Sequence, residues 1–150
     1  MRNPYLADLV IKDKKDDPLA VIDVVNFPGF SREQAIGLRR RLIDYGLPAQ
    51  LPYFLLLTQD IGFLWKDTEK DQLDVPPNYE FPMDGLVQRY EKASSQRRLY
   101  RWELEWLILQ WFAHLRASSE PDTEEPELTL VRSGLRELIK DVSLLPDEEV

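Results

Sequence analysis

The sequence predicts an α+β fold, with a small mixed sheet of about four strands, one packed helix and a C-terminal helical extension. Two short apolar runs joined by turn residues predict a β-hairpin near the N-terminus. A capped helix follows, and then two more apolar runs of strand length. Beyond about residue 84 the apolar residues recur at helical spacing, and this change of period marks the extension.

The predicted hairpin carries an aspartate on each arm. Its arms are Tyr5–Ile11 and Leu19–Val25, and Asp13–Pro18 supplies the turn chemistry between them. If the hairpin is symmetric about the middle of this turn, Asp8 faces Asp23 with the two Cβ atoms roughly 4.5–5.5 Å apart. Two carboxylates that close repel each other unless a cation or a proton lies between them. The pair is therefore the first candidate site.

The next segment has the marks of a helix. Ser31 followed by Gln34 is a capping-box spacing, and Gly46 and Pro48 are stop signals just after Tyr45. Apolar residues at spacings of three and four predict the face that packs on the sheet. These residues are Ala35, Leu38, Leu42 and Tyr45.

Two strands are expected after this helix. The run Pro52–Thr58 is almost wholly apolar, as in a central strand covered on both faces. Ile61–Lys66 follows after a link too short for a crossover, which indicates a hairpin partner. The intervening helix leaves two arrangements open, because the second and third strands can be parallel neighbours or can be separated in the sheet.

The chain is predicted to form one domain over residues 1–150, large enough to bury a core without cross-links. Residues 1–66 form the αβ core, residues 67–84 a linker or exposed loop, and residues 85–145 the helical extension. Within the extension we expect a short helix from Leu86, a longer one over residues 96–116 and a final one over residues 130–142. Residues 118–127 are a polar acidic loop, and the tail from Pro146 is expected to fray.

The charge is uneven along the chain. The net charge is −8, yet residues 1–66 hold 9 Lys/Arg against 8 Asp/Glu, while residues 67–150 hold 10 against 19. An acidic protein is a poor nonspecific binder of nucleic acid, because phosphate neutralisation supplies most of that affinity. The absence of cysteine excludes disulfides and thiolate chemistry. Without a signal-peptide pattern or an apolar run of membrane-spanning length, we expect a cytoplasmic protein with no membrane partner.

Two basic or aromatic clusters invite functional hypotheses. Three consecutive arginines, Arg39–Arg41, suggest phosphate binding, but three successive helix residues cannot face one ligand, so a solvated polar face is favoured.

The three tryptophans Trp102, Trp106 and Trp111 could stack on bases, although helical aromatics favour the core. A protein contact such as a homodimer is the better alternative. Because apolar residues cover so much of this helix, it must be buried on more than one side. The single histidine, His114, near the helix C-terminus is explained by the macrodipole.

The acidic pair carries a resemblance to a known family. An aspartate on one strand, followed some fifteen residues later by Asp23 in a hydrophobic strand, resembles the PD-(D/E)XK nuclease superfamily, which has the restriction endonuclease-like fold. The order strand, strand, helix, strand, strand and helical tail is similar to a small branch of it. The resemblance covers roughly residues 4–66 well. The superfamily lysine position holds Val25, and residues 1–3 cannot form the helix that normally precedes the first strand, so the chain is either a trimmed relative or begins upstream in its native form.

The resemblance implies a site and a reaction. Asp8, Asp23 and the backbone carbonyl of Val24 would hold Mg²⁺ for phosphodiester hydrolysis, and Gln34 would reach the site unless it serves only as the cap partner. With Val25 in the lysine position, cleavage is expected to be impaired or absent.

Three hypotheses remain open. The first is a nuclease-like protein that is impaired or inactive and acts in nucleic-acid-related binding or regulation. The second is an active Mg²⁺-dependent endonuclease acting on DNA with a displaced cation, and the third is a non-catalytic protein-protein interaction module using the Trp-rich helix. Metal binding at the aspartates separates the third from the others, and cleavage separates the first two.

Overall fold

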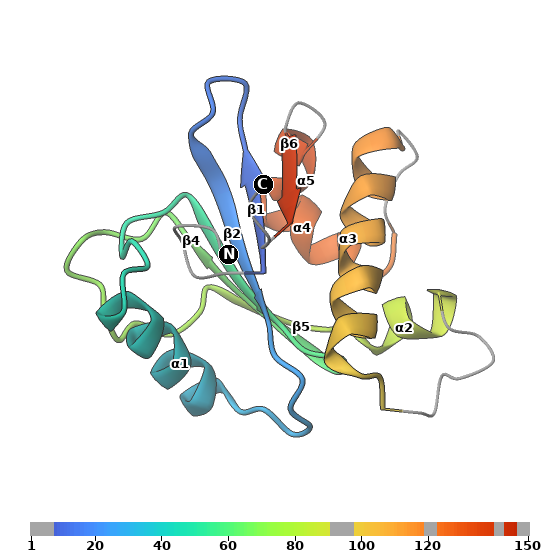
Figure 1. Ribbon diagram of the computed structural model, residues 1–150, viewed down its shortest axis with the longest axis horizontal. Coiled ribbons are helices and arrows are strands. Elements are labelled where there is room, and N and C mark those ends of the chain that lie inside the picture. The colour runs from blue at the N-terminus through green and yellow to red at the C-terminus, as the bar shows by residue number, and fades with distance from the viewer. Residues whose placement is uncertain (1–7, 91–97, 119–122, 140–142, 147–150) are drawn as a thin grey trace.

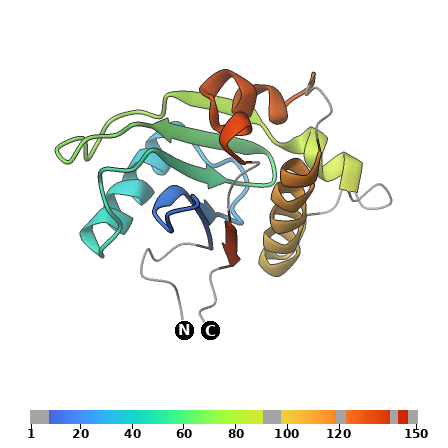
Figure 2. The same cartoon turned by 90° about the horizontal axis from the view of Figure 1, so that it is seen from above.

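The computed structural model describes residues 8–90, 98–118, 123–139 and 143–146, and it has an α+β architecture (Figures 1 and 2). Its mixed sheet has six strands in the order β5-β4-β3-β2-β1-β6. The elements are β1 (Leu9–Lys12), β2 (Pro18–Val24), α1 (Arg32–Asp44), β3 (Tyr53–Leu57), β4 (Ile61–Lys66), β5 (Tyr79–Pro82), α2 (Asp84–Tyr90), α3 (Arg101–Ala117), α4 (Glu127–Ser133), α5 (Leu135–Leu138) and β6 (Ser143–Pro146). Within these described residues, no helix combines the length and the apolar character needed to cross a membrane.

The N-terminal hairpin has the predicted register. In the antiparallel pair β1 and β2, Leu9 lies opposite Ile22 and Val10 opposite Val21, which is the symmetry expected from the turn. A bulge shifts the register only after Ile11, next to the turn. The prediction for this hairpin is therefore confirmed from residue 8 onward, and the predicted first residues of the strand lie outside the described part of the chain.

Helix α1 joins β2 to β3 and makes these two strands parallel neighbours. Ser31 is the N-cap and forms the complete predicted capping box with Gln34, and Tyr45 is the C-cap. The prediction that Tyr45 packs on the sheet is wrong, because its side chain is 73% exposed at the end of the helix. Strand β3 is buried throughout, as its apolar sequence predicts, between β2 and β4.

Two apolar clusters lie on opposite faces of the sheet, because side chains alternate along each strand. On one face, Phe54 and Leu56 of β3 pack with residues of α1. On the other face, Leu55 and Leu57 pack with the helical extension, chiefly the buried face of α3. Figures 1 and 2 show α1 (cyan) and α3 (orange) on the two sides of the sheet.

The extension and the loop before it both contribute strands that the sequence reading did not find. Strand β5 lies within residues 67–84 and pairs with β4, and β6 pairs antiparallel with β1 at the other sheet edge. The final predicted helix is divided at Gly134, whose φ of 87° ends α4 before α5 begins. Such a left-handed conformation is favourable for glycine. Gly134 therefore ends α4 and does not lie inside a helix.

A buried carboxylate ties the helices of the extension together. Glu127 at the start of α4 accepts a hydrogen bond of 2.8 Å from the indole Nε1 of Trp111 in α3. It also accepts contacts of 2.8 Å from Arg89 of α2. Three helices therefore meet at Glu127, and these hydrogen bonds offset the free-energy cost of burying its carboxylate.

The interpretation of the three arginines as a solvated face is wrong for Arg39. Its side chain is buried beneath the loop that follows β4, while Arg41 is exposed. The guanidinium donates to the carbonyl oxygens of Ala49 and Gln72 and lies over the ring of Trp65. Arg39 thus holds loops together from inside the fold and is not placed to bind an external phosphate.

Helix α3 corrects the prediction that it is buried on more than one side. Trp111 lies in the core, but the side chains of Trp102 and Trp106 are 67% and 58% exposed. The core interpretation of the three tryptophans is therefore right for one and wrong for two. The described fold leaves an aromatic surface on the outer side of this helix.

Candidate functional site

The two predicted aspartates meet at one end of the hairpin. Asp8 immediately precedes β1, and its backbone N–H donates to the carbonyl of Ile22 at 3.0 Å, which brings it beside Asp23 of β2. Both residues are buried, at 8% and 7% exposure, and their carboxyl groups share a hydrogen bond. The strand alternation and the turn length together place this pair, as the sequence indicates.

A cation from a distant element binds Asp8. Arg101, the first residue of α3, places one guanidinium nitrogen 3.0 Å from both Oδ1 and Oδ2 of Asp8. Its Nε donates to Oε2 of Glu105 at 2.9 Å, one turn further along the same helix. We refer to Asp8, Asp23, Arg101 and Glu105 as the Asp8 cluster.

The backbone adds one more donor to Asp8. The amide of Val24 donates to Asp8 Oδ2 at 2.7 Å, a short distance typical of a bond to a charged acceptor. Val24 is therefore shown contacting the cluster through its amide, whereas the resemblance assigns a role to its carbonyl.

The pKa values of Asp8 and Glu105 are shifted in opposite directions. Burial raises the pKa of Asp8, but hydrogen bonds from Asp23, Glu105 and the Val24 amide, with the charge of Arg101, outweigh it and leave the pKa lowered. Burial raises the pKa of Glu105, and its hydrogen bond with Asp8 raises it further. The pKa of Asp8 is thus lowered while that of Glu105 is raised, so of these two carboxyl groups Asp8 loses its proton first.

The Asp8 cluster is not arranged to hold a divalent cation. Among the described residues, no group of three or more Asp, Glu or His side chains is placed to hold a metal ion. Both oxygens of Asp8 already accept bonds from Arg101, and one also accepts from Val24. As arranged, the cluster does not fit Mg²⁺, and a metal would first have to displace the guanidinium.

The remaining predicted site residues lie apart from this chemistry. The amide of Val25 donates to the carbonyl of Leu57, and its half-buried side chain packs against the apolar cluster on the α1 face. Gln34 Oε1 accepts from the Ser31 amide at 2.8 Å, which is the capping-box contact. The structure therefore brings Asp8, Asp23 and Val24 together and gives Gln34 a helix-capping contact.

Arg101 and Glu105 are the members that sequence reasoning missed. The spacing of four residues does predict a helical ion pair. However, 93 residues separate Arg101 from Asp8, and no local pattern connects them.

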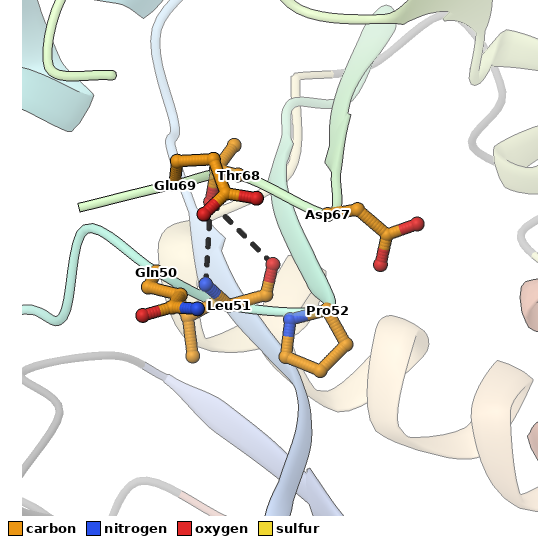
Figure 3. Close-up of a pocket in the computed structure, with 6 residues that line it drawn as sticks. All are labelled: Gln50, Leu51, Pro52, Asp67, Thr68 and Glu69. Atoms are coloured by element: carbon orange, nitrogen blue, oxygen red, sulfur yellow. Dashed lines mark hydrogen bonds between the residues drawn. The ribbon is translucent and has the colours of Figure 1, made fainter. Parts of the chain in front are cut away.

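A separate shallow pocket of about 360 Å³ lies at the other end of β3, beside residues that precede this strand and follow β4 (Figure 3). Its lining residues are Gln50, Leu51, Pro52, Asp67, Thr68 and Glu69. Thr68 Oγ1 accepts from the Leu51 amide at 3.2 Å and donates to the carbonyl of Ala49 at 2.6 Å. These contacts close the loop, so the buried polar atoms of Thr68 are occupied by the fold itself.

Comparison of the chain with protein-family models, with curated proteins and with solved structures found no match.

Proposed function

We propose that this chain is a PD-(D/E)XK nuclease-like domain that carries the acidic pair but does not cleave nucleic acid. We propose that it acts in nucleic-acid-related binding or regulation. The observation that carries this proposal is the Arg101 guanidinium on Asp8, at the position where the resemblance implies Mg²⁺. The order β1, β2, α1, β3, β4 with a parallel β2 and β3 also supports the resemblance.

The chemistry of the cluster favours binding over hydrolysis. A positioned acid or base contributes roughly 10²–10⁴-fold to a rate. The usual lysine position holds the apolar Val25, and the nearby Arg101 cannot act as a base because guanidinium does not deprotonate. The cluster is therefore equipped to hold its own charges in place, and no step through a metal follows from it.

A cleavage assay on DNA and RNA with Mg²⁺ or Mn²⁺ tests the proposal. We expect the wild-type chain to cleave no faster than Asp8→Asn/Asp23→Asn. Arg101→Gln combined with Val25→Lys should raise cleavage, because the first change frees Asp8 and the second returns the lysine. The lysine variant is expected to fold, because Val25 is half-buried. A lysine stem there can lie along the apolar cluster and keep its ammonium group in water. Circular dichroism establishes that each variant is folded, and wild-type cleavage that disappears in the double asparagine variant would contradict the proposal.

The second candidate is an active Mg²⁺-dependent endonuclease with a displaced cation, and Arg101 is the observation that favours it. In that case Arg101 replaces the charge of the missing lysine, and Arg101→Gln should lower cleavage. Under the first proposal the wild type does not cleave, so Arg101→Gln has no cleavage to lower. The same change should raise the affinity for Mg²⁺, because the competing guanidinium is removed. Calorimetric titration of Mg²⁺ into wild type, Arg101→Gln and the double asparagine variant separates the two.

The third candidate, an interaction module, rests on a different part of the molecule. The exposed Trp102 and Trp106 favour it, because tryptophan is enriched at protein interfaces. This candidate does not require cleavage or metal binding at the Asp8 cluster.

A further inference from the structure

The outer side of α3 presents a continuous stripe of apolar side chains. It begins with the exposed Trp102 and Trp106, opposite the face that packs on the sheet. It continues with Leu109, which is half-buried and packs in part against the core, and then with the exposed Ala113 and Ala117. Spacings of three and four keep these five residues on one side of the helix. We refer to these five residues as the α3 stripe.

The stripe is graded in size along the helix. Its N-terminal half carries two indole rings, and its C-terminal half carries two methyl groups. A second helix running in the same direction would place large side chains against large ones. A helix running in the opposite direction would place large against small, and that alternation fills an interface evenly.

We propose that the α3 stripe binds the α3 stripe of a second copy of this chain, with the two helices antiparallel. In the register that fits, Trp106 lies opposite the partner's Ala113, and Trp102 lies opposite the partner's Ala117. Leu109 then lies opposite the partner's Gln110, next to the two-fold axis. Each indole packs over a methyl group, as a knob enters a hole between packed helices.

The charges beside the stripe fit the same register. In an antiparallel two-fold pair, each flank of the helix meets the same flank of the other copy. One flank carries Glu105 and Arg116, and the other carries Glu103 and His114. Glu105 and the partner's Arg116, which carry opposite charges, are then offset by two residues, about 3 Å along the axis, and Glu103 and the partner's His114 are offset by the same amount. On both flanks the acid lies in the N-terminal half and the basic group in the C-terminal half, so the surface is complementary to itself.

These flanking acids also argue against single-stranded nucleic acid as the occupant. A stacking platform for bases is normally surrounded by positive charge that follows the phosphates. Here Glu103 and Glu105 flank the two indoles, and the chain as a whole carries a net charge of −8. The observations therefore favour a second copy.

The size of the contact sets the expected strength. One helix from each copy belongs to the small class of interfaces, below about 1,200 Å² in total. Such areas give weak or transient complexes, so we expect half-dissociation on the order of 10 μM. Sedimentation velocity across this concentration range measures it directly.

Size-exchange variants test the register. Trp106→Ala should weaken the dimer at least roughly tenfold, because the central knob is lost. Ala113→Trp should weaken it as well, since two indoles would then meet at one level, and combining the two changes should restore it. Tyr45→Ala at the end of α1 is the control, because Tyr45 is an exposed aromatic residue elsewhere on the surface. Nonspecific adhesion of apolar surface would instead be strengthened by Ala113→Trp, and that result would overturn the proposal.

Single cysteines test the direction of the helices in the native, cysteine-free chain. A disulfide requires Cα atoms within about 7 Å. Gln110→Cys lies beside the proposed axis and should cross-link to itself, whereas two copies of Ala117→Cys would be about 22 Å apart along the helices and should not. Equal cross-linking of both variants would indicate parallel or random association.

Two further outcomes would overturn the proposal. The first is a wild-type chain that stays monomeric at about 200 μM, well above the expected dissociation constant. The second is a monomer that binds a labelled oligothymidine and loses this binding in Trp106→Ala, which would assign the stripe to nucleic acid. Because none of these variants changes a residue of the Asp8 cluster, failure of these assays is distinct from failure of the proposed function.

Discussion

Replacing the buried Arg39 by lysine should destabilise the fold although the charge is kept. The guanidinium is 1% exposed and uses two nitrogens at once. One donates to the carbonyls of Gln72 and Leu73 at 2.9 and 3.4 Å, and the other donates to Ala49 at 3.1 Å. The group also lies 5.6 Å from the centre of the Trp65 ring. Lysine has a single nitrogen and no planar group, so it cannot make both sets of contacts.

The size of the effect follows from these contacts. A lysine that keeps the bond to Ala49, whose carbonyl also accepts from Thr68, leaves the part-buried carbonyl of Gln72 without its donor, at a cost of about 1–3 kcal/mol. Losing the planar contact with Trp65 costs a further ~0.5–2 kcal/mol. We therefore expect Arg39→Lys to lower the free energy of unfolding by about 2–4 kcal/mol, a large part of the 5–15 kcal/mol typical of a domain.

Urea denaturation followed by far-ultraviolet circular dichroism measures this loss. Arg41→Lys is the matched control on the same helix, because Arg41 is exposed and its replacement should change stability by less than about 0.5 kcal/mol. Hydrogen exchange should also quicken in the loop before Val75, whose carbonyl accepts from Trp65. An Arg39→Lys variant as stable as the control would refute the account of Arg39 as a loop anchor.

Three other predictions concern the sheet and the site. A Cβ at Gly62 would overlap the ring of Phe81, so Gly62→Ala should cost about 1–3 kcal/mol in urea denaturation, and unchanged stability would show that the ring moves aside freely. Tyr53→Phe removes the 2.7 Å bond to the Ser133 carbonyl and should cost about 1–2 kcal/mol, with no loss meaning that another donor replaces it. The lowered pKa of Asp8 adds stability above its unfolded-state pKa of about 3.9, and this is lost as the pH falls through the folded-state pKa. Asp8→Asn should therefore be less stable near neutral pH and lose less stability on acidification, and parallel pH curves for variant and wild type would contradict this.

Some of the candidate site could be derived without the structure. The hairpin turn and the alternation of its arms place Asp8 beside Asp23, and the observed register agrees. The capping residues likewise define the start of α1 at Ser31. These features depend on neighbours within about twenty residues, and turn chemistry and side-chain alternation encode such contacts locally.

Other parts needed the folded chain. The two edge strands β5 and β6 are short segments whose pairing depends on a neighbour already in place. The exposed Trp102 and the buried Trp111 lie on one apolar helix, and only the packing of α3 on the sheet decides which faces outward. Residue type alone does not settle burial when apolar residues surround a helix.

The sequence by itself determined the hairpin, its acidic pair, the capped helix and the apolar central strand. The tertiary structure decided which cation pairs with Asp8, because Arg101 reaches it across 93 residues of chain. It also decided that Arg39 is buried while Arg41 is exposed. The reason is physical: local backbone preferences act between near neighbours, whereas desolvation and ion pairing depend on which surfaces meet after folding.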